Sequence, residues 1–175
     1  MNHIRSIRFI FAAIYVVILA ELAIAIPVDK SQAIQLEADR GQLDQKTGTS
    51  LYEGNVVIIQ GSMQLDADAA TIQVKNNIFQ RMYATGNPAS LRYKPAAAKP
   101  EMHGTSKRVE YDVASGKVVM EGSVKIIRGQ DIFSGEHLEY DLKNDIIRAN
   151  GANSGRIKFM IQPDPQKMGS TVKKP

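Results

Sequence analysis

The chain has 175 residues, of which 43% are hydrophobic and 23% charged, and this is typical of one globular domain. It contains no cysteine, which excludes disulfides, thiol catalysis, thiolate zinc sites and iron–sulfur clusters, and three histidines argue against a histidine-rich metal centre. The net charge of +4 comes without a dense basic stripe, so a nucleic-acid groove is not favoured. No metal or cofactor is expected.

The N-terminus has the pattern of an export signal. Arg5 and Arg8 precede the apolar run Phe9–Ala20, and the small residues Ala23 and Ala25 fit cleavage after Ala25. The run is shorter than the ~20 residues that a helix needs to cross a membrane. We therefore predict a cleaved signal peptide over residues 1–25 and delivery of the remainder across a membrane. Retention of residues 9–26 as a membrane anchor is the alternative.

The rest of the chain is predicted to form strands. Apolar and polar residues alternate in the runs 34–39, 70–75, 91–94, 108–113, 137–143 and 156–161, which indicates a sheet with one dry and one wet face. Turn signals about 8–12 residues apart are typical of a β-sandwich, barrel or roll. The expected turns are Thr47-Gly48, Glu53-Gly54, Gln60-Gly61, Asn76-Asn77, Thr85–Pro88, Ser115-Gly116, Glu121-Gly122, Asn144-Asp145 and Asn150-Gly151.

Two segments are predicted to lie outside the strands. Pro95–Pro100 is an internal loop, bounded by proline at both ends. Residues 162–175 contain prolines and no apolar periodicity, so we expect a disordered polar tail. The folded domain is therefore expected to span residues 26–161.

The chain contains an internal repeat. Residues 36–78 align with residues 104–146, and the best-matched segments are Tyr52–Gly61 and Met120–Gly129. Each copy reads as a strand–turn–strand unit with one apolar face that it cannot bury alone. Stacking the two units would close a shared core and leave the first and last strands, Ile34–Asp39 and Arg156–Ile161, as sheet edges.

The repeated motif resembles the OstA-like domain family. It comprises Ala38-Asp39, Leu43-Asp44, Gly48, Glu53-Gly54-Asn55-Val56, Gln60-Gly61, Leu65–Asp68 and Ile72. The resemblance covers residues 34–161 and implies an all-β, single-domain β-jellyroll, open at both ends, in the periplasm. It further implies that lipid A acyl chains of lipopolysaccharide are held inside. Its implied partners are a membrane-anchored protein of the same fold at the N-terminal edge and an outer-membrane lipopolysaccharide translocon at the C-terminal edge.

The apolar face supplies the candidate lining of that interior. Most apolar faces are only core, so it is the resemblance, and not the alternation, that favours an acyl-chain groove over a dry core. The candidate lining residues are Ile34, Leu36, Leu43, Val56, Ile58, Leu65, Ile72, Val74, Leu91, Tyr93, Val109, Tyr111, Ile126, Phe133, Leu138 and Tyr140.

The two edge strands supply the candidate partner interface. Exposed strand edges invite pairing, and a first edge that meets the last edge of another copy would give a head-to-tail homo-oligomer. The alternative is that the tail or loops cover both edges. The candidate interface residues are Ile34, Gln35, Leu36 and Glu37 at the first edge, and Arg156, Ile157, Lys158 and Phe159 at the last.

Catalysis is not supported, because no nucleophile elbow, phosphate-binding loop or zinc-protease motif occurs in the sequence. Several lysines and arginines could meet phosphates, but such residues usually form a solvated face. The leading hypothesis is a non-enzymatic carrier of lipopolysaccharide between two membranes. The alternatives are a membrane-anchored assembly partner of the same fold and a β-rich scaffold domain with no lipid ligand.

Overall fold

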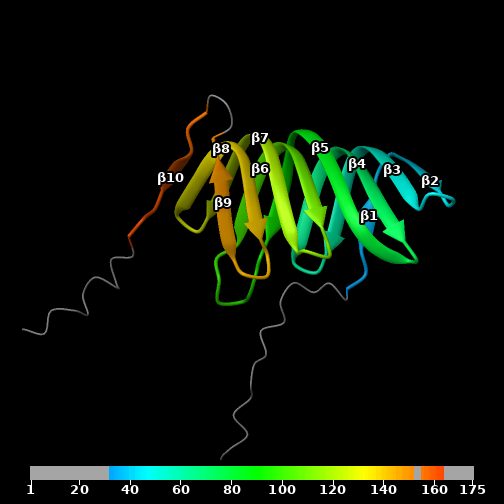
Figure 1. The fold of residues 1–175 in the computed structure, drawn as a ribbon, viewed down its shortest axis with the longest axis horizontal. Helices are drawn as coiled ribbons and strands as arrows, with labels where there is room; N and C mark the ends of the chain where they lie inside the picture. Colours follow the sequence, from blue (N-terminus) through cyan, green and yellow to red (C-terminus); the bar gives the residue numbers. More distant parts are fainter. Residues whose placement is uncertain (1–31, 152–154, 164–175) are drawn as a thin grey trace, which may run out of the picture.

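The computed structural model describes residues 32–151 and 155–163, and these residues form one antiparallel sheet (Figure 1). Neighbouring strands lie in the order β1-β3-β4-β5-β6-β7-β8-β10, with β2 also beside β3 and β9 also beside β8. The strands are β1 Gln35–Glu37, β2 Arg40–Asp44, β3 Thr49–Gln60, β4 Met63–Lys75, β5 Ile78–Tyr93, β6 Met102–Asp112, β7 Lys117–Arg128, β8 Asp131–Asp141, β9 Ile146–Asn150 and β10 Lys158–Met160. None of the described residues belongs to a helix that could cross a membrane.

The sheet is folded over along a row of irregularities, which we call the crease. Each pair of neighbouring long strands shifts register near its middle, at Glu53/Val56, Asp66/Ala69, Thr85/Ala89, Thr105/Arg108 and Glu121/Val124. Bulges bend a strand and sharpen its twist, so a row of them turns one sheet into two facing layers (Figure 1). The result is a roll that is open at both ends, which confirms the predicted all-β jellyroll.

The two layers are two walls made from opposite halves of the same strands. The first wall holds β1, β10 and the half of each long strand that pairs with them, such as Val57–Ile59 in β3. The second wall holds β2, β9 and the other halves, such as Thr49–Glu53. The margin opposite the crease, where the turns of the two walls approach each other, is called the seam below.

Three expected turns are wrong, because they lie inside strands at the crease. Gly54 and Gly122 both have φ +79°, and Asn55 and Ser123 after them also have positive φ. Glycine followed by a left-handed residue is a turn signal in sequence, but here the pair forms a bulge within β3 and β7. Thr85–Pro88 likewise lies within β5. The other expected turns lie at or beside strand ends, and 95–100 is a loop as predicted.

The internal repeat is confirmed by matching backbone geometry. Strands β2–β5 correspond to β6–β9. In the first unit Gly48 N–H donates to Asp44 and the Gly48 carbonyl accepts from Val74 N–H. In the second, Gly116 N–H donates to Asp112 and its carbonyl accepts from Leu142 N–H. Two units of equal geometry are therefore stacked along one axis.

Candidate functional site

The candidate site is the space between the walls. Twelve of the predicted lining residues have exposed fractions of 9% or less, and three more, Ile34, Leu36 and Val74, are half-buried against them. The twelve are Val56, Ile58, Leu65, Ile72, Leu91, Tyr93, Val109, Tyr111, Ile126, Phe133, Leu138 and Tyr140. The alternation in the sequence thus identified the inner face of both walls.

Leu43 is the exception, since its side chain is 60% exposed. It pairs with Ser50, which is buried, so Leu43 lies on the inner face as expected. It is uncovered because β2 is an edge strand with no neighbour on its other side among the described strands. Leu43 therefore lies on the predicted face of its strand, but the prediction that it is buried in the interior is wrong.

The interior contains a small cavity at the end of the roll near β1. The cavity has a volume of about 10 Å³ and lies between the walls. Ile58 and Met63 line it from the first wall, and Phe79, Met82 and Tyr111 line it from the second. A long acyl chain does not fit in this cavity, so it could enter the interior only if the two walls moved apart.

The seam is tied across in the second repeat unit by four residues that we call the clasp. Asp145 accepts hydrogen bonds from Lys99 Nζ at 2.8 Å, from Arg128 Nη1 at 3.1 Å and from the Tyr140 hydroxyl at 2.7 Å. Lys99 and Arg128 belong to the first wall side of the seam, and Asp145 and Tyr140 to the second. Burial alone would raise the pKa of Asp145, but the bonds from Lys99 and Tyr140 outweigh it and lower that pKa. The carboxylate is therefore charged at neutral pH and joins the two walls.

Among the residues that the structure describes, the first unit shows no ion cluster at the place of the clasp. The positions that align with Arg128, Tyr140 and Asp145 are Gln60, Ile72 and Asn77, which together supply no charge. The small cavity lies in this part of the roll, and it is lined by Gln60 among others. Apolar packing joins the walls along the roll, and the clasp adds charged contacts in the second unit.

The two ends of the roll carry unpaired strand edges. Within the described ranges, β1 and β2 pair only with β3, and β9 and β10 pair only with β8. The predicted edges omitted β2 and β9. Arg156 and Ile157 were expected in the last strand but precede it, because the chain turns at Gly155, whose N–H bonds to the Gly151 carbonyl.

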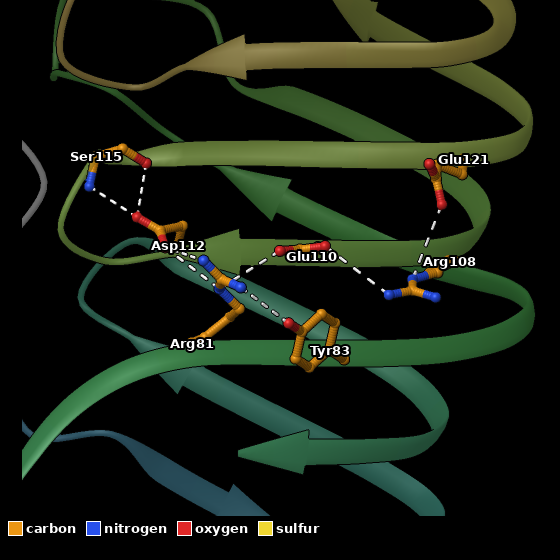
Figure 2. A network of polar contacts seen from close by, with 7 residues as sticks. All are labelled: Arg81, Tyr83, Arg108, Glu110, Asp112, Ser115 and Glu121. Atoms are coloured by element: carbon orange, nitrogen blue, oxygen red, sulfur yellow. Dashed lines mark hydrogen bonds and ion pairs between the residues drawn. The ribbon is translucent and has the colours of Figure 1, made fainter. Parts of the chain in front are cut away.

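The exposed outer face of the second wall is laced with ion pairs (Figure 2). Arg81 contacts Asp112 at 2.9 Å and Glu110 at 3.5 Å, and Arg108 lies 5.2 Å from the centre of the Tyr83 ring. Hydrogen bonds from Ser115, followed by one from Arg81, lower the pKa of Asp112 to about 2. These cations are already matched by carboxylates, as expected for a solvated face.

A basic hollow lies outside the crease at the β10 end. It has a volume of about 340 Å³ and is lined by three cations, Lys125, Arg156 and Lys158, against one carboxylate, Glu136. Elsewhere in the described ranges, no group of three or more His, Asp or Glu is placed to hold a metal ion. The described part of the molecule therefore offers an apolar interior, strand edges and a basic hollow.

Comparison with known proteins agrees with this fold. A family model described as LptA/(LptD N-terminal domain) LPS transport protein matches residues 35–146. The chain belongs to this LPS transport family. Membership confirms the resemblance found in the sequence and the prediction of a non-enzymatic protein.

Individual members of the LPS transport family match most of the chain. Lipopolysaccharide export system protein LptH of Pseudomonas aeruginosa is 33% identical over 152 residues, covering 82% of this chain and 87% of that protein. The LptA proteins of Haemophilus influenzae and Escherichia coli are 25% and 23% identical. The crystal structure of P. aeruginosa LptH, titled the LptA homologous periplasmic component of the lipopolysaccharide transport device, matches with a TM-score of 0.73 at 32% identity, covering 78% of this chain and 100% of that one.

Sequence reasoning missed the clasp and the second strand at each edge. Asn144-Asp145 was recognised only as a turn, and Lys99 only as part of a loop. The signal that could have found the clasp is the difference between the repeats. Gln60, Ile72 and Asn77 of the first copy align with Arg128, Tyr140 and Asp145 of the second, which adds two charges and a hydroxyl.

Proposed function

We propose that this protein is a periplasmic carrier of lipopolysaccharide that holds lipid A acyl chains between the two walls of the roll. The observation that carries the proposal is a continuous apolar inner face in a roll with two open ends, in a chain of the LPS transport family. LptH of Pseudomonas aeruginosa, a relative of known structure, is described as the LptA homologous periplasmic component of a lipopolysaccharide transport device. Residues 1–25, the expected cleaved signal peptide, lie outside the described residues, as does residue 164 onward of the expected tail.

The energetics of such binding are favourable without a specific polar site. Each acyl methylene removed from water contributes about 0.8 kcal/mol. The cost is the separation of walls that pack against each other in the structure described. We expect that separation to be easiest in the first repeat unit, where the described residues place no ion cluster across the seam and the cavity lies between Ile58 and Met82.

Photo-crosslinking tests the carrier proposal. A photoreactive phenylalanine analogue replaces Phe79, which lines the cavity, and in a second variant replaces Tyr83, an aromatic residue of the same strand on the outer face. We expect lipopolysaccharide to crosslink at position 79 and not at 83. Folded protein that crosslinks at neither position would favour the scaffold with a dry core, and equal crosslinking at both would indicate adsorption to the surface.

We further propose that the free edges of the roll pair with other proteins of the same fold in a head-to-tail manner. Continuing the stack would lay β1 of one molecule antiparallel to β10 of the previous one. Leu36 and Phe159 both lie on the inner face, as their partners Ile58 and Phe133 show. Setting Leu36 opposite Phe159 places Glu37 opposite Lys158 on the outer face, which is an attractive pair.

The partners that this arrangement would serve are those expected from the family. They are a membrane-anchored protein of the same fold at the β1 edge, an outer-membrane lipopolysaccharide translocon at the β10 edge, and a second copy of this chain. Cysteine pairing tests the register, because the chain has no cysteine of its own. Gln35→Cys combined with Met160→Cys should give a ladder of disulfide-linked oligomers, whereas each single variant should stop at dimers. Absence of a ladder at concentrations where the wild-type chain self-associates would refute this register.

A further inference from the structure

One buried polar group of the interior makes no hydrogen bond within the described part of the protein. Among the residues that the structure describes, the hydroxyl of Tyr111 is buried without a hydrogen-bond partner, and the whole residue is only 1% exposed. Of the other two fully buried tyrosines, Tyr93 and Tyr140, the second donates its hydroxyl to Asp145 at 2.7 Å. A buried hydroxyl without a partner destabilises a fold, so native proteins rarely keep one without a reason.

The surroundings of Tyr111 locate that hydroxyl in the part of the roll that can open. Tyr111 lines the cavity of about 10 Å³, together with Ile58, Met63 and Phe79. Its ring is held by an edge-on contact with Phe79, with centroids 6.0 Å apart. This is the first-unit end of the interior, where the seam carries no clasp. Parting of the walls here would enlarge the space that Tyr111 lines and could expose its buried hydroxyl to a ligand.

A water molecule is a poor match for this space. The cavity is at the lower limit of the volume that holds one water, and a buried water needs two to four polar partners. A carboxylate or phosphate is a worse match, since a charge would lose its hydration among side chains that, apart from Gln60, are aliphatic or aromatic. The environment suits a largely apolar molecule that carries a small uncharged oxygen group.

We propose that the Tyr111 hydroxyl is a specificity-determining hydrogen-bond partner for an uncharged oxygen, hydroxyl or carbonyl, borne by an acyl chain that enters between the walls. The assignment rests on the proposed carrier function and deepens it, because burial alone would make the roll accept any acyl chain. Burial raises the pKa of Tyr111, so the hydroxyl keeps its proton and can both donate and accept. Phenylalanine would fill the same space without this capacity.

The decisive variant is Tyr111→Phe, studied in the full folded domain. The probes are tetradecanoic acid and tetradecanoic acids that carry one hydroxyl or one keto oxygen at carbon 3, 7 or 12, each displacing a fluorescent fatty acid. One hydrogen bond changes affinity by up to about tenfold. We expect the wild-type protein to bind at least one oxygenated chain about five- to tenfold more tightly than Tyr111→Phe does. The unsubstituted chain should bind the two proteins within about twofold.

The stability of the free protein gives a second and opposite readout. Removing an unsatisfied hydroxyl should raise the Tm of Tyr111→Phe by about 2–4 °C, whereas Tyr140→Phe, the matched control, removes a hydroxyl that is bonded to Asp145 and should lower Tm. A Tm that falls in Tyr111→Phe would mean that the hydroxyl has a structural partner, and would overturn the proposal.

The binding outcomes separate this proposal from the carrier function. If Tyr111→Phe changes the affinity of every chain equally, or of none, the proposal fails while lipid carriage stands. If none of the test chains displaces the fluorescent fatty acid from the wild-type protein, the proposal and the carrier function both fail. Loss of preference for hydroxylated chains alone would assign a hydroxyl as the ligand group, and loss for keto chains alone would assign a carbonyl.

Discussion

The clasp at the seam gives the sharpest test of how the walls are held together. Asp145→Asn removes one charge and keeps an oxygen that can still accept a hydrogen bond. The replacement introduces no backbone strain, because Asp145 has φ +55° and asparagine tolerates that region. Asn77, the aligned residue of the first unit, has φ +59°. The variant therefore gives the second unit the residue that the first already has.

The magnitude follows from the three contacts of Asp145. A hydrogen bond to a charged group contributes about 1.5–3 kcal/mol and a neutral one about 0.5–1.5 kcal/mol, so the buried Tyr140 bond loses about 1 kcal/mol. The Arg128 side chain is 26% exposed, so weakening its contact with residue 145 costs about 1 kcal/mol or somewhat less. The Lys99 side chain is 50% exposed, so its contact contributes little. We expect the free energy of unfolding to fall by about 2 kcal/mol and Tm by about 4–8 °C.

Urea unfolding at pH 7 and at pH 3 measures this prediction. The pKa of Asp145 is lowered in the folded protein, so its stabilisation is complete above the ordinary value of 3.8 and is lost as the pH falls through the folded value. The difference between wild type and variant should therefore shrink on acidification. Glu121→Gln, which removes a carboxylate 3.9 Å from Arg108 on the exposed face, is the control and should change stability by less than about 0.5 kcal/mol. A wild-type-like stability of Asp145→Asn at pH 7 would refute the clasp.

Three further predictions concern the crease, the outer face and the edges. Gly122→Ala should lower stability by at least about 1–3 kcal/mol in thermal unfolding, because φ is +79° and the new methyl meets Lys107 at 3.0 Å; a stable variant would show that the bulge is not needed. Asp112→Asn should remove part of the stability that wild type loses between about pH 4 and pH 2, because the pKa of Asp112 is lowered to about 2 and its contribution is present above that range; identical acid-unfolding curves would contradict this. Glu37→Lys should weaken self-association in sedimentation experiments, and the double variant with Lys158→Glu should restore it; no rescue would argue against the register with Lys158 opposite Glu37.

The sequence predicts the walls well because burial leaves a direct pattern. A strand with one dry face must alternate, so Leu91, Val109 and Tyr111 were identified as inward-facing without knowledge of the fold. The repeat added the expectation that two like units stack and leave the first and last strands as edges. These features depend on local chemistry that each residue carries with it.

The crease and the clasp depend on neighbours and were not predicted. Gly54 and Gly122 have the same sequence signature in a bulge as in a hairpin turn, and only the continuation of pairing on both sides distinguishes the two. Asp145 is unremarkable until Lys99 and Arg128 approach it from the other side of the seam. The exposure of Leu43 likewise follows from its place in an edge strand, which no local pattern records.

The order of the strands has a consequence for how the chain folds and tolerates shortening. From β3 to β8 each strand pairs with the one that follows it, so distance along the sequence maps onto distance along the roll (Figure 1). Hairpins then form from residues that are near in sequence, which lowers the contact order. We therefore expect faster folding than for β-sandwiches whose paired strands are far apart in sequence. Deleting strands from one end removes a slice of the molecule rather than half of every contact. Stability should therefore decline in steps as the chain is trimmed, as in arrays whose repeats touch only their neighbours.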